Sequence, residues 1–139
     1  MFTVSANFTG PRYYDELLGP LWFEYYAADL ARRLPQQPGD ILEIACGTGI
    51  VTRRLRERAH LLARLVATDV SKAMLDYARQ KIPVSGIDWR EANALDLPFP
   101  NGEFSTVVCG FGLMFMPDRE RALREARRML QAGGIFRTG

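Results

Sequence analysis

The sequence predicts an α/β fold in which a parallel β-sheet of about five strands carries helices on both faces. Short apolar runs, typical of strands buried on both faces, alternate with amphipathic segments of helical period. This alternation is typical of βαβ units and therefore of a parallel sheet. The length of 139 residues fits a single domain.

The composition is that of an ordinary globular protein, with 47% hydrophobic and 24% charged residues. No apolar run reaches the roughly 18 residues of a membrane-spanning helix, and residues 1–10 lack the pattern of a secretory signal. Two cysteines and one histidine exclude a disulfide scaffold and a zinc cluster of His and Cys ligands. These observations predict a cytoplasmic protein with no metal and no membrane span.

The expected elements follow one another in a regular order. Strands are expected at residues 41–46, 65–69, 87–91 and 104–109, and a fifth would begin at residues 135–136. Helices are expected at residues 13–18, 21–34, 50–59, 72–81 and 119–130. Ser71 and Asp118 are candidate N-caps, and Gly133–Gly134 is expected to stop the last helix.

Candidate functional residues lie where the expected strands end. Ligands of such sheets bind beyond the carboxyl ends of the strands, near the point where the strand order reverses. The four strand exits are residues 46–49, Asp69, residues 93–95 and residues 109–111. We therefore expect the site to be assembled from these segments.

The first exit contains Gly47 and Gly49, which allow a tight turn and a close approach of a ligand to the backbone. The third glycine of the dinucleotide-binding pattern is replaced by Thr52, which weakens the prediction of a pyrophosphate site. A plain turn remains an alternative for this segment. Asp69 ends the next strand about 20 residues after Gly49, where an acidic side chain can accept hydrogen bonds from both hydroxyls of a ribose. The alternative role for Asp69 is to cap the following helix.

Glu43 is unusual because it is a carboxylate within an apolar strand. Burial of such a group costs several kcal/mol unless it is paired or hydrogen-bonded. Glu43 would therefore anchor the glycine loop or reach a cationic ligand, directly or through water. The alternative is a side chain at the end of the strand that faces solvent.

Four ordered segments resemble the motifs of class I S-adenosylmethionine-dependent methyltransferases. They are residues 41–49, residues 66–75, residues 91–100 with Phe104, and residues 111–118 with 130–134. The resemblance is strongest to the branch that includes the ubiquinone/menaquinone-biosynthesis methyltransferases. It implies a Rossmann-like sheet, S-adenosyl-L-methionine as the cofactor, and methyl transfer to a small-molecule acceptor.

The resemblance also assigns cofactor-binding residues. The glycine loop would lie against the methionine part of the cofactor with support from Glu43, Asp69 would hold the ribose, and Val70 and Met74 would lie beside the adenine. Asn93, at a position where the family often has Asp, would contact the adenine amino group, and the backbone of Cys109–Gly110 would meet the amino group of the methionine part. The full expected set is Glu43, Ala45, Cys46, Gly47, Gly49, Asp69, Val70, Met74, Asn93, Ala94, Leu95, Cys109 and Gly110.

On the acceptor side the resemblance suggests Tyr14, Phe111 and Met114. No catalytic residue is assigned, because attack on a methyl group carried by a cationic sulfur needs alignment and a dry site more than covalent help. His60 would lie at the far end of its helix and is rejected as a base. Residues 1–36 would form a helical cap segment and residues 37–139 the cofactor-binding core.

The chain departs from the family pattern near its end. The family sheet usually has seven strands, of which the last two form an antiparallel hairpin. No segment of this sequence corresponds to that hairpin, so we expect a truncated domain. A fifth strand would then be an open edge, where we expect self-association or a partner.

Other functions are weaker candidates, and a non-catalytic cofactor-binding or assembly subunit is the main one. Thr52 and the single histidine disfavour a nicotinamide dehydrogenase. Binding of nucleic acid is disfavoured because the arginine clusters are interleaved with glutamates, which is typical of solvated helix faces.

Overall fold

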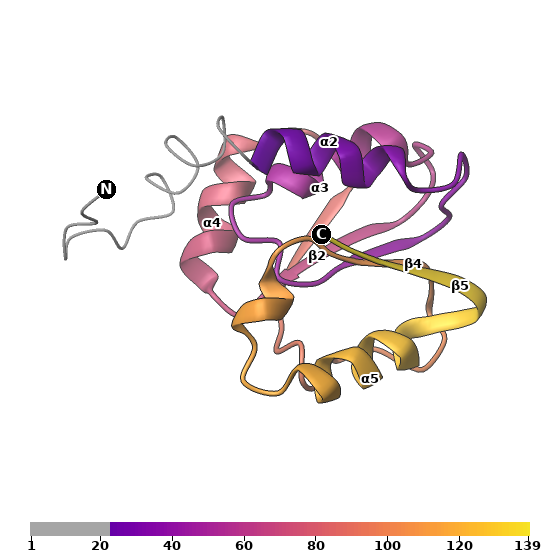
Figure 1. The fold of residues 1–139 in the computed structure, drawn as a ribbon. Helices are drawn as coiled ribbons and strands as arrows, with labels where there is room; N and C mark the ends of the chain where they lie inside the picture. The colour runs from indigo at the N-terminus through magenta and orange to yellow at the C-terminus, as the bar shows by residue number, and fades with distance from the viewer. Residues whose placement is uncertain (1–22) are drawn as a thin grey trace.

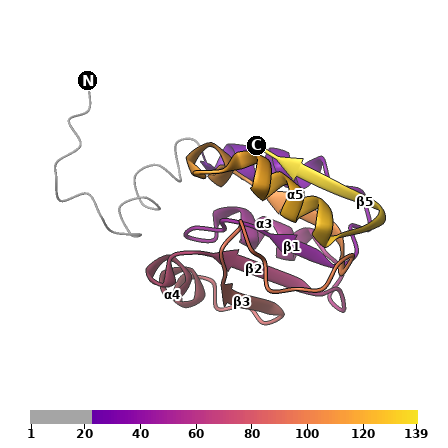
Figure 2. The ribbon, with the colours of Figure 1, turned by 90° about the horizontal axis from the view of Figure 1, so that it is seen from below.

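The computed structural model describes residues 23–139, which form a five-stranded parallel sheet in the order β3–β2–β1–β4–β5. The strands are β1 (Ile41–Glu43), β2 (Leu65–Asp69), β3 (Ile87–Glu91), β4 (Phe104–Cys109) and β5 (Leu130–Thr138). From β1 in the centre, the chain first builds one side of the sheet and then returns to build the other. The strand order therefore reverses between β1 and β4, and the predicted α/β fold is confirmed (Figures 1 and 2).

Helices cover both faces of the sheet. The helices are α2 (Glu24–Arg32), α3 (Ile50–Arg58), α4 (Lys72–Lys81) and α5 (Arg119–Met129), with a short 3₁₀ helix, η2 (Gly112–Phe115). Figure 1 shows α2 and α3 on one side of the strands and α5 on the other.

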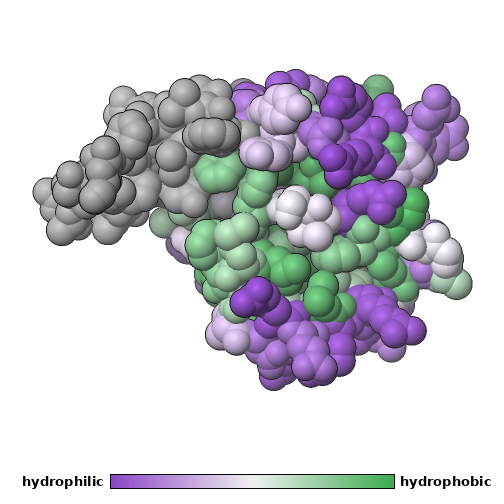
Figure 3. All heavy atoms as spheres, in the orientation of Figure 1, coloured by the Kyte–Doolittle hydropathy of each residue, from purple (hydrophilic) through white to green (hydrophobic). Residues whose placement is uncertain are grey.

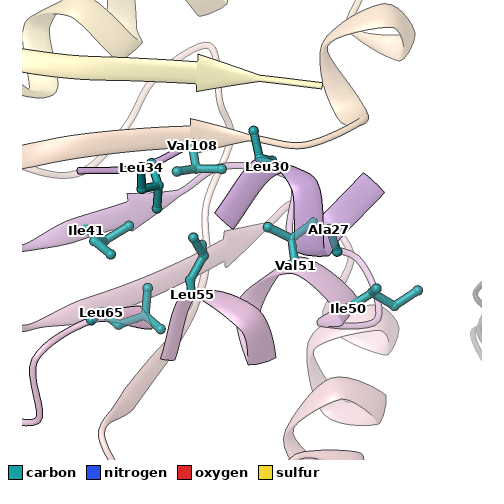
Figure 4. Packing of buried hydrophobic residues seen from close by; sticks show 10 residues of the cluster. Ala27, Leu30, Leu34, Ile41, Ile50, Val51, Leu55, Leu65 and Val108 are labelled. Atoms are coloured by element: carbon teal, nitrogen blue, oxygen red, sulfur yellow. The ribbon is translucent and has the colours of Figure 1, made fainter. Parts of the chain in front are cut away.

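Neighbouring strand residues point to opposite faces because side chains alternate along a strand. Ile41 and Leu65 pack against α2 and α3, in the cluster drawn in Figure 4, whereas Leu42 and Val66 pack in a second cluster with Met129 of α5. Both faces of the central strands are thus buried, as their continuous apolar character predicts.

The starts of α4 and α5 confirm two predicted caps. The Ser71 hydroxyl accepts the Met74 N–H at 3.3 Å, and the Asp118 carboxylate accepts the Arg121 N–H at 3.0 Å. Both bonds satisfy an amide that has no partner within its helix.

Three predicted boundaries need correction. The first strand was expected to continue to residue 46 but ends at Glu43, because Ala45 adopts a left-handed conformation with φ of 56°. The last helix ends at Met129, four residues before Gly133, the first of the glycines expected to stop it, and the fifth strand begins at Leu130 rather than at residue 135. Gly133 and Gly134 lie inside β5, where the register shifts, so the Gly-Gly pair shapes an irregular strand rather than a helix end.

Arg128 of α5 ties that helix to the loop before β4. Its guanidinium donates to both carboxylate oxygens of Glu125 at 2.7 Å, to the carbonyls of Leu97 and Phe99 at 2.8 and 2.7 Å, and to Asn101 Oδ1 at 3.0 Å. The hydrogen bonds from Arg128 lower the pKa of Glu125. One side chain therefore satisfies several acceptors of a loop without regular structure.

β5 forms one edge of the sheet. Figure 3 shows hydrophobic surface around β5 and η2, between hydrophilic surfaces over α2 and α5. The expected association at this edge stays a prediction, as does the division of the chain at residue 36. No helix within residues 23–139 is both long enough and apolar enough to cross a bilayer. The helix expected at residues 13–18 and the first two residues of the one expected at 21–34 lie outside the described residues.

Candidate functional site

A cavity of about 190 Å³ opens at the carboxyl ends of β1, β2 and β4, beside the reversal of strand order. This is the place where open α/β sheets bind ligands. Most of its walls are apolar. It is lined by Phe23, Glu43, Ala45, Cys46, Gly47, Thr48, Ile50, Val51, Asp69, Met74, Gly110, Phe111, Gly112 and Phe115.

The loop between β1 and α3 has two glycines with different surroundings. Both adopt left-handed conformations, with φ of 56° at Gly47 and 86° at Gly49. A Cβ on Gly47, which lines the cavity, would meet nothing within 4 Å, whereas a Cβ on Gly49 would lie 2.5 Å from Ile82 Cδ1. Gly47 therefore leaves room for a ligand, and Gly49 lets the loop pack against the end of α4.

Asp69 holds this loop in place from the end of β2. Its Oδ2 accepts the Gly47 N–H at 2.9 Å, and its Oδ1 accepts the Ser71 N–H at 2.8 Å. The cap of α4 is Ser71 rather than Asp69, so the alternative role for Asp69 is wrong. A carboxylate has about four acceptor sites, so Asp69 keeps capacity for ligand hydroxyls at the cavity that it lines.

Glu43 lines the site and is only 1% exposed, so the alternative of a solvent-facing side chain is wrong. Its carboxyl group accepts a hydrogen bond from the Thr52 hydroxyl, and its backbone carbonyl accepts one from the Thr68 hydroxyl at 2.9 Å. Burial raises the pKa of Glu43 to about 8; the bond from Thr52 lowers it and the nearby charge of Asp69 raises it.

Sequence reasoning missed Thr52 as the partner of Glu43. In the sequence Thr52 counted only as a departure from the glycine pattern, yet it is fully buried in the first turn of α3. A threonine facing a strand that carries a lone carboxylate is the signal that would have found the pair. The hydroxyl supplies the polar partner that a buried carboxyl group requires.

Both cysteines are free and buried. Burial raises the pKa of both thiols, in Cys109 to about 11. Cys46 lines the cavity, whereas Cys109 packs in the core on the α5 side of the sheet. Neither thiol has the lowered pKa of a reactive cysteine.

Aromatic side chains form one wall of the site. The ring of Phe111 lies 4.8 Å from that of Phe23 and 5.9 Å from that of Tyr26, centroid to centroid. Phe115 also lines the cavity while 73% exposed. Met114, expected on the acceptor side, is 59% exposed and is absent from the lining residues, where its neighbour Phe115 appears instead.

The structure does not bring all expected site residues to the cavity. Asn93 is exposed and its Oδ1 accepts the Leu95 N–H at 2.9 Å, so it stabilises its own turn. His60 follows α3, where its Nδ1 accepts the Leu62 N–H at 3.1 Å, and it does not line the cavity. Tyr14 lies outside the described residues. The other expected residues that are absent from the lining are Gly49, Val70, Ala94, Leu95 and Cys109.

The fold and this site together define a class of protein. A sheet that reverses beside β1, a glycine turn with open space at Gly47, and an acidic residue at the end of β2 form a site for a nucleoside cofactor. Within residues 23–139, no group of three or more His, Cys, Asp and Glu residues could hold a metal ion.

The comparisons identify the family. Residues 42–138 match the family model described as "Methyltransferase domain", and the chain belongs to the S-adenosyl-L-methionine-dependent methyltransferases. It is 44% identical over 110 residues to a demethylmenaquinone methyltransferase of Thermus thermophilus, covering 78% of this chain and 49% of that protein. It is 36% identical over 121 residues to a ubiquinone/menaquinone biosynthesis C-methyltransferase of Stenotrophomonas maltophilia, covering 84% of this chain and 46% of that protein.

A solved structure agrees on the fold. A methyltransferase of Methanococcus maripaludis superposes with a TM-score of 0.79 at 22% identity, covering 93% of this chain and 59% of the other. The chain thus spans about half the length of the curated relatives it matches.

Proposed function

We propose that this chain binds S-adenosyl-L-methionine in the cavity at the strand ends and takes part in methyl transfer to a small-molecule acceptor. The observation that carries the proposal is the loop around Gly47, which is open toward the cavity and held by the Asp69 carboxylate. This geometry fits the backbone approach and the ribose contact that a nucleoside cofactor needs.

Each wall of the cavity has a role in this proposal. Asp69 accepts hydrogen bonds from the ribose hydroxyls, and the loop from Ala45 to Thr48 runs along the methionine part, with Gly110 also lining the cavity. The bound cofactor supplies a methyl group on a positively charged sulfur. The apolar walls exclude water and align the reactants, which is the main requirement of such a displacement.

The aromatic wall indicates the class of acceptor. Phe23, Phe111 and Phe115 line the cavity, and Tyr26 packs edge-on against Phe111. Flat aromatic ligands pack well on such rings, in stacked or edge-to-face arrangements. The names of the relatives refer to menaquinone and ubiquinone biosynthesis. We therefore propose a planar aromatic acceptor of the quinone class.

Calorimetric titration with S-adenosylmethionine and S-adenosylhomocysteine tests cofactor binding. Asp69→Ala removes a charged acceptor and should weaken binding by about tenfold or more. Asp88→Asn is the matched control, because Asp88 pairs with Arg90 at 2.9 Å on β3 and does not line the cavity. Unchanged affinity in Asp69→Ala would refute the assigned role.

Transfer of an isotopically labelled methyl group to reduced quinone (hydroquinone) acceptors, whose electron-rich ring supplies the attacking electron pair, tests the reaction itself. Labelled product formed by this chain supports the enzyme. Cofactor binding without any transfer would favour the alternative of a cofactor-binding subunit.

A further inference from the structure

The cavity is unusual in its charge. Its lining contains two carboxyl groups, those of Glu43 and Asp69, and no Lys, Arg or His side chain is among the described residues that line it. A carboxylate in an apolar enclosure is costly without a counter-charge. The cavity is therefore suited to a ligand that brings a positive charge.

The two carboxyl groups are compensated to different degrees. Asp69 accepts two backbone N–H groups, at 2.9 and 2.8 Å, so each of its carboxylate oxygens has a partner in the protein. The carboxyl group of Glu43 has one side-chain partner, the Thr52 hydroxyl, and is almost fully buried. Glu43 is thus the group whose charge is least supported by the protein.

The elements packed around Glu43 supply no cation within the described chain. Helix α3 contributes the Thr52 hydroxyl, and β2 contributes Asp69. The loop after β1 contributes the thiol of Cys46, and β4 contributes the thiol of Cys109. Both thiols have raised pKa values and stay neutral at physiological pH. Any positive charge near Glu43 would therefore come from the ligand.

We propose that Glu43 is a charge-sensing residue of the cofactor site: it loses a proton to solvent when a cationic group of the cofactor arrives, and it thereby selects for positively charged ligands. This inference rests on the proposed function. The cofactor carries two such groups, the sulfonium and the α-ammonium, and the product S-adenosylhomocysteine keeps only the ammonium.

The proposal predicts how many protons are released. With its pKa at about 8, Glu43 is about nine-tenths protonated at pH 7. Binding should then release about 0.9 proton at pH 7.

Calorimetry in buffers of different ionisation enthalpy measures this number. At pH 7, the binding enthalpy of S-adenosylmethionine is plotted against the ionisation enthalpy of phosphate, HEPES and Tris, and the slope is the number of protons released. Adenosine, which is neutral, should give a slope of zero. S-adenosylhomocysteine decides which cation acts: release with both ligands assigns the ammonium, and release with S-adenosylmethionine alone assigns the sulfonium.

Two variants test whether the proton comes from Glu43. Glu43→Gln keeps an oxygen acceptor for Thr52 but has no proton to release, so its slope should fall to zero at pH 7. Glu103→Gln is the matched control; Glu103 pairs with Arg64 at 3.1 Å away from the cavity, and the slope should stay at about 0.9. Circular dichroism confirms that each variant is folded, and if Glu43→Gln is not, the contrast in wild-type release between S-adenosylmethionine and adenosine still tests the proposal.

The outcomes separate this inference from the function on which it rests. Binding of S-adenosylmethionine with a buffer-independent enthalpy at pH 7 overturns the role of Glu43 and leaves cofactor binding in place. Proton release that persists in Glu43→Gln, or that occurs with adenosine, also overturns it. Failure of both cofactor forms to bind the wild-type chain overturns the two proposals together.

Discussion

Alanine substitutions at the two loop glycines should separate folding from ligand binding. Both residues have positive φ, and a left-handed conformation costs an alanine about 1–2 kcal/mol. At Gly49 the new Cβ would also lie 2.5 Å from Ile82 Cδ1 and 3.2 Å from Ala78 Cβ. Overpacking of this kind costs about 1–3 kcal/mol. Gly49→Ala should therefore lower the free energy of unfolding by about 2–5 kcal/mol, and Gly47→Ala by about 1–2 kcal/mol.

Ligand binding should be affected in the opposite order, with the larger loss of affinity in Gly47→Ala. The Cβ of Gly47→Ala meets no protein atom within 4 Å and projects from a residue that lines the cavity. We expect this variant to remain folded while its affinity for S-adenosylhomocysteine falls by about tenfold or more.

Urea unfolding followed by circular dichroism measures the first effect, and calorimetric titration at a concentration of urea where both variants are folded measures the second. The reasoning is refuted if the two variants unfold at the same urea concentration, or if Gly47→Ala binds as tightly as the wild type.

Three further predictions concern single contacts. First, the folded-state pKa of Glu43 is about 8 and its ordinary value is 4.5, so the folded state holds the proton more tightly than the unfolded state does. The stability of the wild type relative to Glu43→Gln should therefore be highest below pH 4.5 and fall by at most about 1.4 kcal/mol per pH unit up to pH 8. Urea unfolding of both proteins across this pH range provides the test. Second, a Cβ on Gly112 would lie 2.3 Å from Ala45 Cβ, so Gly112→Ala should cost about 1–3 kcal/mol, and Ala45→Gly in the same chain should restore most of it; a double-mutant cycle without coupling contradicts this. Third, Arg128→Ala should lower the free energy of unfolding by about 2–3 kcal/mol, because it leaves several acceptors unpaired. Arg128→Lys should restore little of this stability, since an ammonium lacks the forked geometry of the guanidinium group. Thermal unfolding of both variants provides the test.

Local patterns in the sequence were sufficient for most of the fold. The bounds of β2, β3, β4 and α4 match the expected ones, and the Ser71 and Asp118 caps are confirmed. These features depend on periodicity and on hydrogen bonds between residues close in sequence, both of which can be read along the chain. The position of Asp69 at a strand exit belongs to the same group, because the end of a strand is a local property.

The tertiary structure alone decided which distant residues meet. The Thr52 partner of Glu43 and the joining of Phe23 to Phe111 depend on how helices pack on the sheet, and the shift in β5 depends on its pairing with β4. The sequence alone determined that a carboxylate would lie in an apolar strand beside a glycine turn. The packing of α3 on β1 determined that this carboxylate is buried with one hydroxyl for a partner, because burial is a property of neighbours that are remote in the chain.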